Sequence, residues 1–232
     1  MKKDYKVIGF DADDTLWVNE PYFRDSENAF CSLLSIYMEP AMVQRVLFRI
    51  EVKNMPLYGY GVKAFMLSMM EAALEVSRNQ LTGDIMKQII ALGKEQLNKE
   101  VILLEGVSEV LEKMKEKGQK VVVITKGDLL DQERKLAKSG LDSCFHHVEI
   151  MSEKHENDYA KLLEHLEVDA SDFLMIGNSI KSDILPVLNI GGYGIHIPFH
   201  ETWEFEKIDL KVDHPHFMEI NHVSELHQLL GL

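Results

Sequence analysis

The residues with the clearest chemical potential lie near the N-terminus, where three aspartates fall within four positions. Asp11 and Asp13 stand two residues apart and directly follow the apolar run Val7–Phe10. In an extended chain, side chains at i and i+2 point to the same side, so both carboxylates would face one space. Because two such acids repel each other, we expect a divalent cation between them, and oxygen ligands beside a phosphate favour Mg²⁺. The competing interpretation is an acidic turn that caps the following helix.

A second polar group stands at the end of the apolar run Val121–Ile124. The hydroxyl of Thr125, together with the backbone N–H groups of Lys126 and Gly127, could cradle the oxygens of a phosphate group. The alternative is that Thr125 caps the helical pattern that begins at position 129. The sequence therefore makes Thr125 and Lys126 candidates for phosphate binding.

Two further polar groups complete the pattern. Lys154 is the candidate to offset the charge of a phosphate group, and we prefer it to Lys161, which lies inside a helical pattern where a lysine usually faces solvent. Asn178 follows the apolar run Phe173–Ile176, and Asp183 comes five residues later. The alternative here is that Asn178 or its neighbour caps a helix.

The elements that must position these residues alternate along the chain. The three apolar runs lack polar alternation, which is typical of strands buried on both faces. Helical periods are expected over residues 108–117, 129–139 and about 158–166, strands over 193–199 and 217–220, and a closing helix over 223–230. This order predicts an α/β fold with a parallel sheet covered on both sides. Ligands of such sheets bind beyond the carboxyl ends of the strands, where all the polar groups fall.

The stretch between the first strand and the rest of the sheet has a different pattern. It predicts helices over residues 21–37, 41–52, 63–76 and 82–97, with apolar side chains at helical spacing. The breakers between them are Pro40, Pro56, Gly59, Gly61 and Gly83. We therefore expect a helical module of residues 18–103 inserted into a core of residues 1–17 and 104–232.

Composition limits the classes of partner. The chain has 232 residues, with 25 Lys and Arg against 38 Asp and Glu, a formal net charge of −13. This balance argues against nucleic acid or an anionic membrane as a partner. Two cysteines do not make a disulfide framework, and no apolar run reaches the roughly 18 residues of a membrane span. We expect a soluble, cytoplasmic protein, and the sequence does not indicate its oligomeric state.

Taken in order, these motifs resemble those of the haloacid dehalogenase (HAD) superfamily of phosphohydrolases over nearly the whole chain. The segment Asp11-Ala12-Asp13-Asp14-Thr15-Leu16 resembles the first motif of the superfamily, and Thr125 matches the second. Lys154 matches the lysine of the third motif, and Gly177-Asn178-Ser179 with Asp183 resembles the fourth. Leu104-Glu105-Gly106-Val107 resembles the segment that follows an inserted helical cap. The resemblance implies a Rossmann-like three-layer parallel-sheet core with an all-helical cap domain.

The resemblance also implies a Mg²⁺-dependent phosphatase of small phosphorylated metabolites. Asp11 would attack phosphorus to form an aspartyl-phosphate, and Asp13 would act as the general acid and base. The residues implied in phosphate binding are Thr125, Lys126 and Lys154, and those implied in holding Mg²⁺ are Asp11, Asp13, Asn178 and Asp183. Asn178 departs from the acid that is usual in the fourth motif, so a weaker hold on the metal is expected.

Several alternatives remain open at this point. The dehalogenases of the superfamily lack the second acid, so Asp13 argues against that activity. Phosphoryl transfer of the mutase type within the superfamily fits the same motifs. A phospho-accepting signalling domain uses a similar set of side chains, but its acceptor aspartate follows a middle strand of a shorter chain. A phosphate-binding or scaffold protein with a lapsed active site is the remaining alternative, which Asn178 suggests. The motifs do not identify the substrate.

Overall fold

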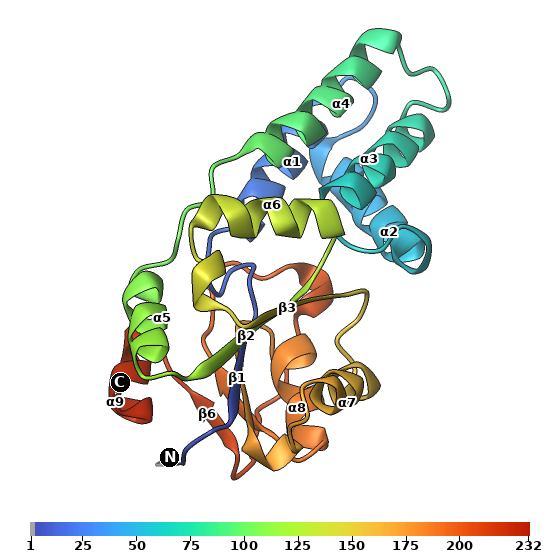
Figure 1. Ribbon diagram of the computed structural model, residues 1–232. Coiled ribbons are helices and arrows are strands. Elements are labelled where there is room, and N and C mark those ends of the chain that lie inside the picture. The colour runs from blue at the N-terminus through green and yellow to red at the C-terminus, as the bar shows by residue number, and fades with distance from the viewer. Residues whose placement is uncertain (1–2) are drawn as a thin grey trace. The chain divides into compact units, whose positions relative to one another are not determined.

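The computed structural model describes residues 3–232 (Figure 1). The chain forms two compact units, which we name the sheet unit and the helical unit. The sheet unit contains the residues up to Glu20 together with Val101–Lys126 and Glu133–Leu232. The helical unit contains Pro21–Glu100 and the short segment Gly127–Gln132.

The segment Gly127–Gln132 was expected in the core and instead groups with the helical unit. Within this unit, Lys63 forms an ion pair with Asp128, with 2.8 Å between the ammonium nitrogen and the carboxylate oxygen. A Cβ atom added at Gly61 would lie 3.1 Å from the backbone nitrogen of Asp128, so the two backbones pass close to each other. These contacts connect residues 127–132 to the inserted helices.

Among residues 3–232, six parallel strands form the sheet of the sheet unit, in the order β3-β2-β1-β4-β5-β6. The strands are β1 (Val7–Phe10), β2 (Lys120–Lys126), β3 (His147–Met151), β4 (Phe173–Gly177), β5 (Tyr193–His196) and β6 (Phe217–Glu219). Phe10 lies opposite Val123 in β2 and Ile176 in β4. The chain therefore leaves the three central strands at the same edge of the sheet.

Helices cover both faces of the sheet, as Figure 1 shows for α5 on one side and α7 and α8 on the other. The α-helices of this unit are α5 (Val107–Glu116), α7 (Glu156–His165), α8 (Leu185–Asn189) and α9 (Leu226–Leu230). The helix α6 (Leu129–Ser139) belongs to the helical unit up to Gln132 and to the sheet unit from Glu133 onward. Short turns are η1 (Asp142–Cys144), η2 (Ala170–Asp172), the π-helical η3 (Ile180–Ile184), η4 (Glu204–Glu206) and η5 (Val223–Glu225).

Neighbouring side chains of β1 enter two separate cores. Ile8 belongs to the same buried cluster as Leu111 of α5, whereas Val7 belongs to the cluster that contains Leu162 of α7. Alternation across a strand places successive side chains on opposite faces, so a strand with helices on both sides is apolar throughout. The predicted α/β fold, a three-layer Rossmann-like arrangement with an inserted helical segment, is confirmed.

The helical unit has its own apolar core. Its helices are α1 (Glu20–Leu33), α2 (Pro40–Tyr58), α3 (Val62–Val76) and α4 (Gly83–Asn98). Each contributes a fully buried side chain to one cluster, namely Phe30, Leu47, Met69 and Ile89. Within residues 3–232, none of the helices has both the length and the apolar character needed to cross a membrane.

Three details differ from the sequence-based expectation. The helix α2 continues through Pro56, which was expected to interrupt it, and ends at Tyr58. The strand β3 was not anticipated, since His147–Met151 lies at the edge of the sheet and is only partly buried. The strand β5 ends at His196 rather than at residue 199, and the N–H of Ile197 donates to the carbonyl of Gly177.

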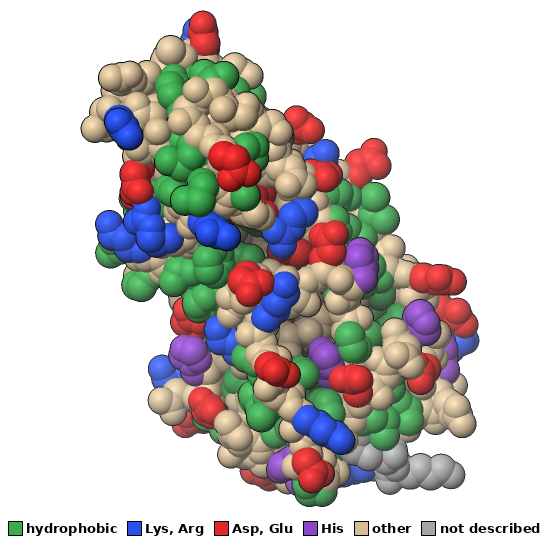
Figure 2. All heavy atoms as spheres, turned by 180° about the vertical axis from the view of Figure 1, so that it is seen from behind, with side chains coloured by type: hydrophobic (Ala, Val, Ile, Leu, Met, Phe, Trp, Pro, Cys, Tyr) green, Lys and Arg blue, Asp and Glu red, His purple; other side chains and the backbone are tan. Residues whose placement is uncertain are grey.

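Charged side chains of both signs are interspersed over the face of the molecule shown in Figure 2. Among the described residues seen from this side, the surplus of acidic side chains is not gathered into one patch. On this face the acidic side chains are therefore dispersed among basic ones.

Candidate active site

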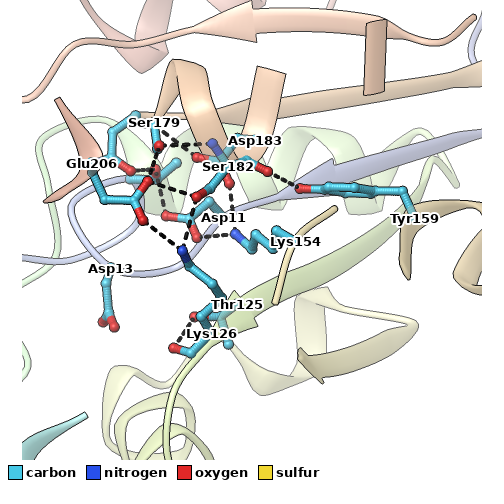
Figure 3. A network of polar contacts seen from close by, with 12 residues as sticks. Asp11, Asp13, Thr125, Lys126, Lys154, Tyr159, Ser179, Ser182, Asp183 and Glu206 are labelled. Atoms are coloured by element: carbon cyan, nitrogen blue, oxygen red, sulfur yellow. Dashed lines mark hydrogen bonds and ion pairs between the residues drawn. The ribbon is translucent and has the colours of Figure 1, made fainter. Parts of the chain in front are cut away.

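The carboxyl edge of the sheet brings most of the candidate residues together (Figure 3). Asp11 follows β1 directly, Thr125 lies near the end of β2, and Lys154 comes three residues after β3. Asn178 and Asp183 both follow β4. Residues far apart in the sequence thus meet because parallel strands end at a common edge.

Lys154 is the centre of this cluster. Its side chain is buried, with an exposed fraction of 2%, and its ammonium nitrogen lies 2.5 Å from Asp11 Oδ1 and 2.7 Å from Asp183 Oδ1. Burial favours the neutral amine, but the charges of Asp11 and Asp183 outweigh it and hold the pKa of Lys154 above its ordinary value. Lys154 is therefore a permanent cation between two carboxylates.

For Asp11, in contrast to Lys154, the surroundings favour the neutral form. Burial, and then the nearby charge of Asp183, raise the pKa of Asp11 to about 7, although Lys154 opposes the shift. One ammonium group faces two buried carboxylates, so the cluster has one negative charge in excess. An additional cation at this point would favour the ionised form of Asp11.

Near Asp11, the acceptor oxygens of Asp11 and Asn178 share a single hydroxyl donor. The hydroxyl of Thr15 lies 3.1 Å from Asp11 Oδ2 and 3.3 Å from Asn178 Oδ1. A hydroxyl has a single proton, so it cannot donate to both acceptors at once. The excess of carboxylate and amide oxygens, together with the excess negative charge, fits a hard divalent cation such as Mg²⁺.

Asp183 is held by the turn that follows β4. Its Oδ2 accepts a hydrogen bond of 2.9 Å from the N–H of Ser179, and its side chain has an exposed fraction of 1%. The π-helical turn brings this side chain back over the end of β4, where a Cβ atom on Gly177 would overlap it. Glycine at position 177 is thus required for the close approach of Asp183.

Asp13 lies apart from the Lys154 cluster and has different partners. Asp13 Oδ1 accepts hydrogen bonds from the indole N–H of Trp17 at 2.7 Å and from the ammonium group of Lys135 at 2.6 Å. In Figure 3 its carboxylate points away from Asp11 and Lys154. The two carboxylates of the first motif are therefore separated both in position and in partners. Lys135 lies on α6 and was not a sequence candidate.

Residues next to the candidate site residues, rather than the candidates themselves, cap the helices that follow. Asp14, which has a φ of 62°, accepts hydrogen bonds from the N–H groups that precede and begin α1. Asp128 accepts from the N–H of Asp131 in the first turn of α6, and Ser179 accepts from the N–H of Ser182. Capping is therefore the function of these neighbours, and it does not account for Asp11, Thr125 or Asn178.

Lys126 has an environment that the sequence did not predict. Its ammonium group lies 2.7 Å from Glu206 Oε1 and donates to the hydroxyl of Ser182 at 2.9 Å. The hydroxyl of the buried Thr125 lies 3.4 Å from the carbonyl oxygen of Lys126. Glu206 was missed because it lies in a segment without helical or strand periodicity, so no local signal marks it.

Glu206 gives a prediction for the dependence of stability on pH. Burial alone would raise the pKa of Glu206, but the charge of Lys126 and three hydrogen bonds lower it from 4.5 to about 2. An acid with a lowered pKa stabilises the fold above its unfolded pKa, and this contribution is lost as the pH falls toward the folded value. We expect Glu206→Gln to be less stable than the wild type at pH 7, with a difference that shrinks between pH 4.5 and pH 2. Urea unfolding across this range measures it, and a difference independent of pH would contradict it.

Comparison with known proteins adds to this geometry. The sequence model of the haloacid dehalogenase-like hydrolase family matches residues 5–191. The crystal structure of a haloacid dehalogenase-like family hydrolase from Xanthomonas campestris is 36% identical in sequence and superposes with a TM-score of 0.84, covering 95% of this chain and 89% of that one. The fold and these matches define a hydrolytic enzyme with a Rossmann-like core. The chain belongs to the haloacid dehalogenase-like hydrolase family.

Other relatives have different named activities. A glyceraldehyde 3-phosphate phosphatase from Pyrococcus abyssi is 32% identical over 91 residues, which are 37% of this chain and only 38% of that protein. A 2-haloacid dehalogenase from Pseudomonas syringae has a TM-score of 0.64 at 20% identity, covering 98% of both chains, and this likeness shows the fold alone. The choice of chemistry therefore depends on the side chains at the sheet edge.

Proposed function

We propose that the protein is a Mg²⁺-dependent phosphatase that hydrolyses a small phosphorylated metabolite through an aspartyl-phosphate intermediate. The observation that carries the proposal is the separation of the two motif carboxylates. Asp11 contacts the buried Lys154, whereas Asp13 contacts Lys135 and Trp17. Hydrolysis through an aspartyl-phosphate needs one carboxylate that is ionised when it attacks and, in this proposal, another that exchanges a proton. The phosphatase relative from Pyrococcus abyssi supports the same class of activity.

In the first step, an oxygen of Asp11 attacks phosphorus, and a bond from Asp11 to phosphorus forms as the ester bond breaks. Asp13 gives its proton to the departing alcohol oxygen. In the second step, Asp13 takes a proton from a water molecule that attacks the same phosphorus. The bond to Asp11 then breaks and inorganic phosphate is released. Lys154 and Thr125, with the backbone at Lys126, stabilise the phosphoryl oxygens.

The residues that would hold Mg²⁺ are Asp11, Asn178, Asp183 and the backbone carbonyl of Asp13. When bound, the ion supplies positive charge against the phosphoryl oxygens and the buried carboxylates. Among these residues Asn178 is the neutral ligand, and it contributes an amide oxygen where a carboxylate would attract the cation more strongly.

The proposal is tested by incubating the purified protein with a panel of phosphorylated metabolites, with Mg²⁺ and with a chelator. We expect release of inorganic phosphate from at least one compound and loss of that release with the chelator. Transfer of phosphate to a second sugar phosphate without release would instead indicate a mutase. Absence of both reactions at several pH values would contradict the proposal and favour a phosphate-binding protein.

Asn178→Asp should strengthen the binding of Mg²⁺ by about tenfold, because it adds a negative charge to the ligand set. Without the metal, the same variant should melt at a lower temperature than the wild type, since a third carboxylate then lies beside Asp11 and Asp183. Calorimetric titration with Mg²⁺ and thermal unfolding with and without the ion measure both effects. Asn221→Asp, at an exposed position, is the control for the added charge. Equal Mg²⁺ affinity in the two variants would exclude Asn178 as a ligand.

A further inference from the structure

The segment between β5 and β6, residues 197–216, sends one carboxylate into the active site. Glu206 lies in the short turn η4, and its side chain has an exposed fraction of 13%. Glu206 Oε2 accepts hydrogen bonds of 2.7 Å from the hydroxyls of Ser179 and Ser182, while Oε1 lies 2.7 Å from the ammonium group of Lys126. Figure 3 shows these three donors converging on Glu206. The carboxylate is thus fully engaged with residues of the sheet edge.

These donors come from both sides of the strand that ends just before Asp11. Lys126 is the last residue of β2, and Ser179 and Ser182 lie in the turn after β4. In the sheet, β1 lies between β2 and β4 and ends immediately before Asp11. Glu206 therefore joins the two neighbours of the central strand across its carboxyl end.

Ser179 connects Glu206 to Asp183. Its hydroxyl donates to Glu206, whereas its backbone N–H donates to Asp183 Oδ2 at 2.9 Å. Asp183 in turn accepts from Lys154, which also contacts Asp11. A continuous chain of hydrogen bonds and ion pairs thus runs from Glu206 to Asp11, and a displacement of Ser179 would reach both carboxylates.

A second contact holds the backbone next to Glu206. The ammonium group of Lys181 donates to the carbonyl oxygen of Phe205 at 2.7 Å and lies 3.7 Å from the centre of the Phe205 ring. Lys181 belongs to the same turn as Ser182. The segment is therefore attached to this turn through two adjacent residues, which fixes the direction from which Glu206 enters.

We propose that Glu206 is a positioning residue of the active site, which ties the end of β2 to the turn after β4 and so keeps Asp183 and Lys126 in place for phosphoryl transfer. This inference rests on the proposed function. In this arrangement the ammonium group of Lys126 contacts Glu206 and Ser182, so the backbone of Lys126 is the part that we assign to the phosphate oxygens. The same contacts explain why a segment without regular structure lies against the sheet edge.

The test compares Glu206→Ala and Glu206→Gln with Glu204→Gln. Glu204 is a matched control, because it lies in the same turn and pairs with Lys207 at 2.9 Å but is exposed. For Glu206→Ala, hydrogen exchange of residues 178–185 should become at least fivefold faster. The kcat for p-nitrophenyl phosphate should fall at least tenfold while KM changes less than threefold. Glu206→Gln keeps the reach of the side chain and loses its charge, so it should lie between the alanine variant and the wild type.

The proposal would be overturned if Glu206→Ala had the same hydrogen exchange rates at residues 178–185 as Glu204→Gln. It would also be overturned if the two variants had the same kcat. A fall in kcat that was matched by an equal rise in KM would also overturn it, since substrate binding would then be the property affected. If Glu206→Ala does not fold, Glu206→Gln alone decides, by the same comparison with Glu204→Gln. If the wild type releases no phosphate from any ester, the proposed function fails, while the exchange data still show whether Glu206 holds the turn.

Discussion

Asp11→Asn should lower the turnover of phosphate esters by more than about a thousandfold, because an amide is not a nucleophile toward phosphorus. The fold should remain, since asparagine has the same shape and its oxygen can still accept a hydrogen bond from Lys154. The melting temperature should not fall, because the change removes one of two buried carboxylates that share a single ammonium group. Steady-state kinetics and thermal unfolding measure the two effects. Turnover near that of the wild type would contradict the assignment of Asp11 as the nucleophile.

A control in the same motif separates the role of Asp11 from a general effect of losing an acid there. Asp14 is also buried, but it accepts hydrogen bonds from the backbone at the start of α1. We expect Asp14→Asn to keep turnover within about threefold of the wild type, because asparagine retains one acceptor oxygen.

Acid quenching of the wild type during turnover should in addition trap phosphate on Asp11, which mass spectrometry of the peptide would locate.

Lys154→Met should abolish turnover and also destabilise the fold by about 3–5 kcal/mol. The lysine is buried between Asp11 and Asp183, so its removal leaves two carboxylates close together without a cation. Urea unfolding in the absence of Mg²⁺ measures the loss of stability. Lys161→Met is the matched control, because Lys161 is exposed on α7 and was the alternative candidate from the sequence.

A double variant shows whether the loss arises from the carboxylates. In the Asp11→Asn background, Lys154→Met leaves only Asp183 as an unpaired acid, so the additional destabilisation should be clearly smaller than in the wild type. Equal losses in the two backgrounds would mean that Lys154 stabilises the protein through packing of its aliphatic stem rather than through the ion pairs. If Lys154→Met alone does not fold, a folded double variant would itself support the electrostatic explanation.

The sequence predicted the central part of the fold and the edge of the sheet on which the site lies. The runs at β1, β2 and β4 were recognisable because strands buried on both faces are apolar throughout. The strand β3 lacks this signal, since His147–Met151 is half-buried at the edge of the sheet. The end of α2 was misjudged because Pro56 was expected to end the helix, whereas the helix runs to Tyr58 although the proline removes one N–H donor from its last turn.

The candidate residues from the motifs could be named from sequence, but most of their partners could not. Lys135 reaches Asp13 from α6, and the two residues are 122 positions apart in the sequence. Glu206 reaches Lys126 from a segment with no periodic pattern. Hydrogen bonds between side chains distant in sequence follow from packing, which local patterns do not encode. The motifs thus indicated the candidate residues, and the structure shows which side chains contact them.

The central place of β1 in the sheet also determines when the surroundings of Asp11 are completed during folding. Val7 pairs with Lys120 and Phe173, so both neighbours of β1 come from far along the chain. Such distant pairings form slowly, because loop-closure entropy is lost before the contacts are gained. By contrast, α2, α3 and α4 pack mainly on their neighbours in sequence. A chain emerging from the ribosome can therefore form these helices early, whereas Asp11 lacks its full surroundings until Asp183 and Glu206 have been synthesised.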